Sequence, residues 1–378
     1  MRAAFLLFAA SLVLGGCAAD PPAIPPSELV PIEPSVTLER RWSADAGEAG
    51  RGRFEPWLDE ARVVVADGEG RVTAFDRRSG RRLWTRELDD TLASGVGGGD
   101  GTLYVGTADG TVHALSSEDG QTRWTASMSS EVLVPPVAAF GAVLVRSVDG
   151  RVVALEPADG SERWSVSNTP PALTLTGYGQ PTLVAGGVLV GLDDGRLLAL
   201  ELASGRLIWE SVLSVPSGRS EVERLVDIDA DLVVDDQGIY VANYQGRAAR
   251  LEPARGQIVW SVPMSSVAGL TIAGERVIVI DEEDGVHALE RGSGRTLWTN
   301  EALRGRRLSP PAVLPGGEAI AVGDLEGYVH LLSLEDGTIV GRARPAQERI
   351  ASRPLVDDDR VFVLGRDGSL SAHGIVGR

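Results

Sequence analysis

A unit of about 40 residues recurs eight times along the chain, and this periodicity constrains the fold more than any other feature. The clearest copy, residues 101–124, contains two short apolar runs, an Asp-Gly turn after each run, and a closing Trp124. One unit of this size cannot bury its own apolar face, so neighbouring units must pack against one another. The first-turn glycines that mark the eight copies are Gly70, Gly110, Gly150, Gly195, Gly246, Gly285, Gly327 and Gly368.

Each unit predicts four strands and no helix. The apolar runs are short, rich in β-branched residues and bounded by Asp-Gly or Ser-Gly turns, which is typical of strands joined as hairpins. In the third unit we expect strands over roughly 135–140, 142–147, 151–155 and 161–166. All-β units of four strands and about 40 residues indicate a β-propeller, with the closing tryptophans packed between blades.

The two ends of the repeat array complement each other. The eighth unit stops before its fourth strand and lacks a tryptophan, whereas residues 37–44 carry Trp42 ahead of the first complete unit. We therefore expect residues 37–44 to supply the outer strand of the last blade, which closes the ring and covers two exposed edges. The fold prediction is an all-β, eight-bladed propeller of four-stranded blades over residues 37–378.

The N-terminus has the features of an export signal. Arg2 precedes an apolar run, residues 3–14, that is too short to span a bilayer and is followed by small residues. The run leads to Cys17, the only cysteine in the chain. This pattern resembles the bacterial lipobox, which implies cleavage after residue 16 and a lipid on Cys17. An ordinary secretory signal is the alternative. Residues 17–36 are proline-rich and predict an extended tether.

Composition and residue spacing argue against most other functions. The formal net charge is −17, which disfavours a nucleic-acid partner. No nucleotide-binding or hydrolase motif occurs, and we expect no enzyme activity, no cofactor and no metal site. The histidines fall in different units, too scattered to share a metal, and are expected to be half-exposed strand residues: His113, His287, His330 and His373.

The repeat in residues 101–124 resembles that of pyrroloquinoline quinone enzymes, and two families share it. One is the quinoprotein dehydrogenases. The other is the outer membrane protein assembly factor BamB family, lipoprotein scaffolds of the β-barrel assembly machinery. The lipobox, the length and the eight closed blades resemble the second family. So do three local stretches, namely residues 173–181, 217–229 and 323–328.

The second resemblance implies a non-catalytic scaffold anchored by lipid to the periplasmic face of the outer membrane. It would bind the periplasmic POTRA domains of a BamA-like barrel insertase, with unfolded outer-membrane proteins as further partners. A quinoprotein and a generic cell-envelope binding propeller remain the alternatives. Carried over by residue, the partner-binding positions are Leu173, Leu175, Thr176, Arg224, Asp227 and Asp229, of which Thr176 departs from the arginine that the family often has.

The repeat spacing indicates the same region independently. Successive first-turn glycines lie 40, 40, 45, 51, 39, 42 and 41 residues apart, so extra residues enter two adjacent units, at 166–186 and 211–237. Equivalent insertions in neighbouring repeats emerge side by side on one face, which is commonly the binding face. We expect two leucines as apolar anchors there, with Asp227 and Asp229 as an acidic rim. The alternative is that the leucines are buried in a strand and the aspartates cap turns.

Overall fold

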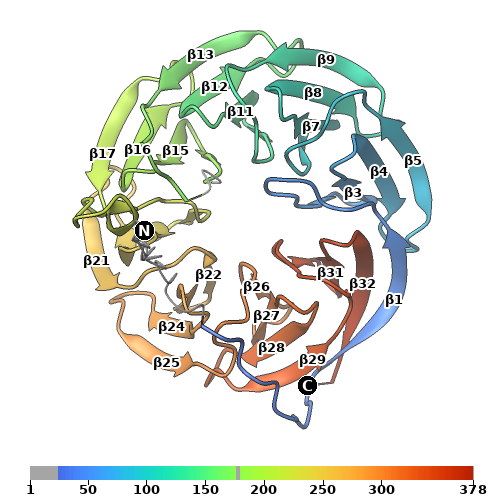
Figure 1. Ribbon diagram of the computed structural model, residues 1–378, viewed down its shortest axis with the longest axis vertical. Coiled ribbons are helices and arrows are strands. Elements are labelled where there is room, and N and C mark those ends of the chain that lie inside the picture. The colour runs from blue at the N-terminus through green and yellow to red at the C-terminus, as the bar shows by residue number, and fades with distance from the viewer. Residues whose placement is uncertain (1–23, 176–178, 378) are drawn as a thin grey trace, which may run out of the picture.

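The protein is a ring of eight four-stranded antiparallel sheets in the computed structural model, which describes residues 24–175 and 179–377 (Figure 1). The predicted eight-bladed propeller is confirmed. The strands of the third unit lie where the sequence pattern places them, with β11 at Ala142–Arg146 and β12 at Arg151–Leu155. In each blade the first strand is innermost and the fourth forms the rim.

Blades 1 to 4 follow one another in chain order. Blade 1 contains β2 (Trp57–Leu58), β3 (Arg62–Ala66), β4 (Arg71–Asp76) and β5 (Arg82–Glu87). Blade 2 contains β6 (Gly97–Gly99), β7 (Thr102–Gly106), β8 (Thr111–Ser116) and β9 (Thr122–Ser127). Blade 3 contains β10 (Val137–Ala139), β11, β12 and β13 (Glu162–Ser167). Blade 4 contains β14 (Thr182–Val184), β15 (Gly187–Gly191), β16 (Arg196–Glu201) and β17 (Leu207–Val212).

Blades 5 to 8 complete the ring. Blade 5 contains β18 (Val233–Val234), β19 (Ile239–Ala242), β20 (Arg247–Leu251) and β21 (Ile258–Pro263). Blade 6 contains β22 (Gly269–Ala273), β23 (Arg276–Ile280), β24 (Val286–Glu290) and β25 (Thr296–Asn300). Blade 7 contains β26 (Ala312–Val313), β27 (Ala319–Gly323), β28 (Val329–Ser333) and β29 (Ile339–Ala343). Blade 8 contains β30 (Leu355–Val356), β31 (Arg360–Leu364), β32 (Ser369–Val376) and the N-terminal β1 (Thr37–Asp45).

The antiparallel order gives the ring two distinct faces. Turns between second and third strands share one face with the connections that run from each rim strand to the next blade, and we call this the crossover face. The only helix among the described residues is a single 3-10 turn on this face, η1 (Val222–Arg224). Across the same described ranges, no helix is long and apolar enough to cross a membrane.

The core lies between neighbouring blades rather than within one. Leu144 of blade 3 and Val190 of blade 4 belong to one buried cluster, and Val65 of blade 1 clusters with Phe362 of blade 8. The residues of the second and third strands alternate between the two faces of each sheet, and both faces are covered by adjacent sheets. This is why the strands are apolar almost throughout, and why no blade is expected to fold alone.

The closing tryptophans join each blade to the next through a repeated contact. Trp124 lies on β9, the rim strand of blade 2. It donates its indole N–H to Pro157 O of blade 3 at 2.9 Å. Its ring packs against Gly160, where a Cβ would come within 2.5 Å of the indole. The glycine has φ +73°, a conformation that disfavours other residues. The tryptophans that make this contact are Trp42, Trp84, Trp124, Trp164, Trp209, Trp260 and Trp298.

The predicted closure by an N-terminal strand is confirmed. β1 pairs antiparallel with β32 along its length, with Thr37 opposite Val376 and Asp45 opposite Ser369. This closure also explains why the seventh unit has Val340 in place of a tryptophan. The third and fourth strands of blade 8, β32 and β1, come from distant parts of the chain and are not joined by a turn. The turn glycine that receives an indole ring in the other blades therefore has no counterpart in the described part of blade 8.

The described part of the proline-rich segment runs along the ring rather than away from it. Ser27 donates its backbone N–H to Arg304 O at 2.8 Å, and Val36 donates to Val340 O at 3.0 Å. Leu29 packs against the apolar cluster between blades 6 and 7. Residues 24–36 therefore follow the surface of these two blades before β1 begins.

Candidate functional site

Two long connections lie side by side on the crossover face. The first insertion loop comprises residues 168–181, between β13 and β14, and the second comprises residues 213–232, between β17 and β18. Leu175 donates its backbone N–H to Asp227 Oδ1 at 3.0 Å, and a Cβ on Gly179 would lie 2.5 Å from Ile228 O. The predicted adjacency of the two insertions is confirmed.

The second insertion loop has an exposed tip and a buried root. In the tip, Glu223 accepts a hydrogen bond from the backbone N–H of Arg219 at 2.6 Å. The root, residues 225–230, is buried along its whole length. Ile228 occupies space beside Gly191, where a Cβ would lie 2.5 Å from the isoleucine side chain. The tip therefore stands on a closely packed base.

The predicted apolar anchors differ in exposure. The side chain of Leu173 is 41% exposed, and that of Leu175 is half-buried. No strand forms over the described residues 173–175. Arg224 is exposed on η1, and its Nη1 lies 3.8 Å from Glu221 Oε1. Two further predicted residues, Thr176 and the lipidation candidate Cys17, lie outside the described residues.

The expectation of an acidic rim is wrong. Asp227 is fully buried and Asp229 is 7% exposed. Both belong to the root of the second loop, where they alternate with the buried Val226 and Ile228. The root fills the space above the junction of blades 4 and 5, so neither carboxylate lies on the exposed surface of the loops. Asp227 supports the first loop through the bond from Leu175, and its side chain is not exposed.

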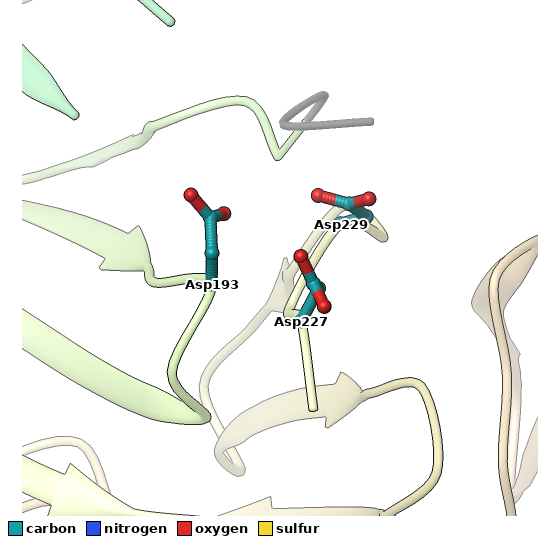
Figure 2. A group of neighbouring side chains, drawn as sticks. All are labelled: Asp193, Asp227 and Asp229. Carbon is teal, nitrogen blue, oxygen red and sulfur yellow. The ribbon is translucent and has the colours of Figure 1, made fainter. Parts of the chain in front are cut away.

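The two aspartates meet a third carboxylate, that of Asp193, in the turn between β15 and β16 (Figure 2). One oxygen from each of the three lies within 4.8 Å of the others. Burial raises the pKa of Asp227 to about 7; the Leu175 N–H opposes the rise, and the charges of Asp229 and Asp193 add to it. The second oxygen of Asp227, Oδ2, is buried and has no hydrogen-bond partner within the described ranges.

One guanidinium balances part of this charge. Arg146, 4% exposed, donates to Asp193 Oδ1 at 2.6 Å and to the carbonyls of Gly179 and Gly191 at 2.9 and 3.0 Å. It thereby ties blade 3 to blade 4 and to the end of the first insertion loop. Together, Arg146 and the three carboxylates form a buried polar centre beneath both loops.

The sequence analysis missed Arg146 and Asp193. Asp193 precedes Asp194-Gly195 and looks like one more turn residue. Arg146 carried a usable signal, because it ends an apolar strand at the position where the neighbouring units have Gly106 and Gly191. A charge at the end of a buried strand requires a buried partner.

The loops also present apolar side chains that the sequence analysis did not select. Val215 is 72% exposed and Val222 is 58% exposed, both on the second insertion loop. With Leu173, they place three exposed apolar side chains on the two loops. Most other exposed large apolar side chains of the described chain lie on rim strands, for example Leu207 of β17. The combination of a buried root and exposed apolar tips suits a protein-binding surface.

The histidines are not at this site, and the expected half-exposure is wrong for three of them. His113, His330 and His373 are buried, because their third strands lie between adjacent sheets. Where a carboxylate is close, the ring bonds to it, as His330 Nε2 does to Asp324 Oδ2 at 2.8 Å. The four histidines lie on the third strands of four different blades: His113, His287, His330 and His373.

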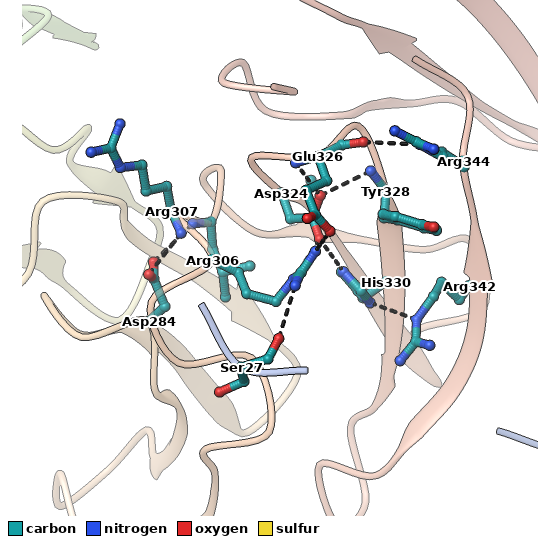
Figure 3. Close-up of polar contacts among 12 residues, drawn as sticks. Ser27, Asp284, Arg306, Arg307, Asp324, Glu326, Tyr328, His330, Arg342 and Arg344 are labelled. Carbon is teal, nitrogen blue, oxygen red and sulfur yellow. Dashed lines mark hydrogen bonds and ion pairs between the residues drawn. The ribbon is translucent and has the colours of Figure 1, made fainter. Parts of the chain in front are cut away.

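The stretch 323–328 has a structural task on another part of the ring (Figure 3). Asp324, fully buried, accepts from Arg306 Nε and from His330, each at 2.8 Å. Burial alone would raise the pKa of Asp324, but these bonds hold it below its ordinary value. Arg306 also donates to Ser27 O at 2.9 Å. This hub fixes the N-terminal segment to blades 6 and 7.

Comparison with known proteins agrees with this architecture. A protein of Pseudomonas aeruginosa, "Outer membrane protein assembly factor BamB", is 46% identical over 374 residues, which cover 98% of each chain. The crystal structure of BamB from Moraxella catarrhalis superposes with a TM-score of 0.82 at 27% identity, over 89% of this chain and 99% of that one.

A quinohemoprotein alcohol dehydrogenase from Comamonas testosteroni shares the fold alone, with a TM-score of 0.72 at 14% identity over 90% of this chain and 76% of that one. The quinoprotein alternative is therefore not favoured. Residues 37–89, 68–300 and 285–374 match a family described as outer membrane protein assembly factor BamB. The match covers the whole propeller, and with the near-full-length relative it shows that this chain belongs to the outer membrane protein assembly factor BamB family.

Proposed function

We propose that this protein is a non-catalytic scaffold of the outer-membrane β-barrel assembly machinery. Its crossover face, at the two insertion loops, would bind the periplasmic POTRA domains of a BamA-like barrel insertase. Family membership supports the general role. The observation that carries the docking face is the set of exposed apolar side chains, Leu173, Val215 and Val222, above a buried polar centre. A preorganised apolar surface of this kind loses little conformational entropy on binding.

The polar centre supports a structural rather than a catalytic role. A general acid or base must reach a substrate, whereas Asp227 and Arg146 are 0% and 4% exposed beneath the loops. Their hydrogen bonds join loop to loop and blade to blade. A quinoprotein would instead bind a quinone cofactor and reduce a dye with an alcohol as substrate. Quinone-dependent dye reduction by this protein would contradict the scaffold role.

The membrane anchor is part of the same proposal. The export signal and Cys17 indicate a lipid-anchored protein at the periplasmic face of the outer membrane. Because both partners would then share one membrane, even a weak contact would be favoured by high effective concentration. Lipid labelling that persists in Cys17→Ser would show that the anchor is assigned to the wrong residue.

The decisive experiment places a photocrosslinking amino acid at position 173 in cells and identifies what it captures. In parallel, Leu173→Asp should weaken capture of the insertase by roughly tenfold or more, as loss of an apolar anchor does. Stability should change by less than about 0.5 kcal/mol, because the side chain is exposed.

The matched control is Leu207→Asp. Leu207 is 51% exposed and lies on the rim strand β17, away from the insertion loops. Equal loss of binding in both variants, or unchanged binding in Leu173→Asp, would refute the assigned face. Capture of an unrelated envelope protein would favour the generic binding propeller. Charge reversal of Asp227 or Asp229 is not a clean probe of docking, since it would place a new cation inside the protein.

A further inference from the structure

Among the described residues, the polar centre under the loops brings three carboxylates together with the guanidinium of Arg146. Arg146 is committed to Asp193 and to two carbonyl oxygens. Asp227 receives one backbone N–H at Oδ1, while its buried Oδ2 has no hydrogen-bond partner among the residues that the structure describes. A buried, uncompensated carboxylate is strongly unfavourable, so such a group takes up a cation or a proton.

The spacing of the oxygens suits a cation. Calcium binds oxygen ligands at about 2.3–2.6 Å, so two ligands on one ion lie at most about 5 Å apart. The three carboxylates meet this condition, with one oxygen from each within 4.8 Å of the others. The unpartnered Asp227 Oδ2 is a second observation, independent of that spacing, because it identifies a buried acceptor with no donor.

An ion could also reach the centre and remain partly hydrated. Asp229 lines a cavity of about 580 Å³ at the crossover-face end of the central channel. Calcium prefers six to eight oxygens, so water from this cavity would complete a shell that three carboxylates only begin. Asp193 and Asp227 are buried and do not line this cavity.

We propose that a divalent cation, with calcium as the best fit, binds between Asp193, Asp227 and Asp229. Bound there, it would join the turn of blade 4 to the root of the second insertion loop. Through the hydrogen bond from Leu175 to Asp227, it would also hold the first insertion loop. The site does not depend on the proposed docking role, because ion binding is measured on the purified protein without a partner.

The test uses the full protein, freed of metal with a chelator and dialysed at pH 7.5. Calcium would be titrated to about 5 mM, which covers the weak range of extracellular sites, with calorimetry and thermal unfolding as readouts. Calcium should bind one site and raise the unfolding midpoint. Asp227→Asn keeps the acceptor for Leu175 but removes a charged ligand, so it should bind calcium at least tenfold more weakly.

Asp109→Asn is the matched control. Asp109 lies in the turn of blade 2 that corresponds to the turn of Asp193 in blade 4, and it is outside the cluster. This variant should bind calcium as the unmutated protein does. Direct calorimetry on the unmutated protein keeps the test valid if Asp227→Asn does not fold. Absence of calcium binding to the parent up to 5 mM, or unchanged binding in Asp227→Asn, would overturn the proposal. If the unmutated protein does not bind calcium and Asp227→Asn is more stable than it, the buried carboxylate binds a proton instead of a cation.

Discussion

Gly160 and Gly141 illustrate two reasons for glycine at a turn, a positive φ and the close approach of another side chain. Both lie in blade 3 with φ +73°, but a Cβ on Gly160 would come within 2.5 Å of Trp124, whereas a Cβ on Gly141 would meet nothing within 4 Å. The left-handed conformation alone costs an alanine about 1 kcal/mol. The clash with the indole adds a packing cost of about 1–3 kcal/mol.

Gly160→Ala should therefore destabilise the protein by about 2–4 kcal/mol and Gly141→Ala by about 1 kcal/mol. Denaturant unfolding of the two variants beside the parent measures both values. Equal destabilisation would mean that the tryptophan–glycine contact does not hold adjacent blades together. The comparison isolates the contact because both variants change the backbone preference in the same way.

The strand pair that closes the ring contains a titratable group. His373 on β32 lies opposite Arg40 of β1, and burial, aided by the charge of Arg40, lowers the pKa of His373 to about 4. Its Nε2 lies 2.9 Å from Ser371 Oγ, while Nδ1 is buried and has no hydrogen-bond partner in the described part of the chain. The folded protein therefore favours the neutral ring.

Acid should weaken this closure. The unfolded histidine gains a proton near pH 6.5 and the folded one only near pH 4, so stability falls as the pH drops between these values. The full loss in the free energy of unfolding, reached below both pKa values, is about 3 kcal/mol. His373→Gln should remove that part of the pH dependence, so the difference in unfolding free energy between parent and variant should change between pH 7.5 and pH 5. A constant difference would contradict the assignment.

Across the whole ring, closure by β1 replaces a covalent connection between the last blade and the first. A chain beginning at Ala46 would lack β1, expose the edge of β32 and leave Gly80 without its indole partner, Trp42. Exposed edges promote association between chains. We expect this truncated protein to form oligomers and to unfold at lower denaturant concentration.

A chain beginning at Val36 is the control, because it retains β1 and the bond from Val36 to Val340. Light scattering after size-exclusion chromatography reports association, and denaturant unfolding reports stability. If the chain beginning at Ala46 stays monomeric with an unchanged midpoint, the closing strand contributes little and the remaining blade contacts suffice.

The repeat was enough to determine the fold, because each local signal is complete within about 40 residues. Asp-Gly turns, apolar runs and Trp124-like closing residues recur at fixed offsets, and neighbouring copies supply one another's core. The unequal ends, with Trp42 unaccompanied and the eighth unit unfinished, were enough to predict closure. The enlarged spacings located both insertion loops and their adjacency for the same reason.

Only the tertiary structure decided what the loop residues do. Asp227 and Asp229 look like surface residues in the sequence, yet packing of Ile228 against Gly191 turns their side chains inward. Asp193 of blade 4 and Arg146 of blade 3 lie close to them in space. These residues are too far apart in the sequence for a local pattern to predict the contact. Repetition determines structure at the scale of one unit and its neighbours, whereas burial of a given charge depends on how irregular segments fill the space between units.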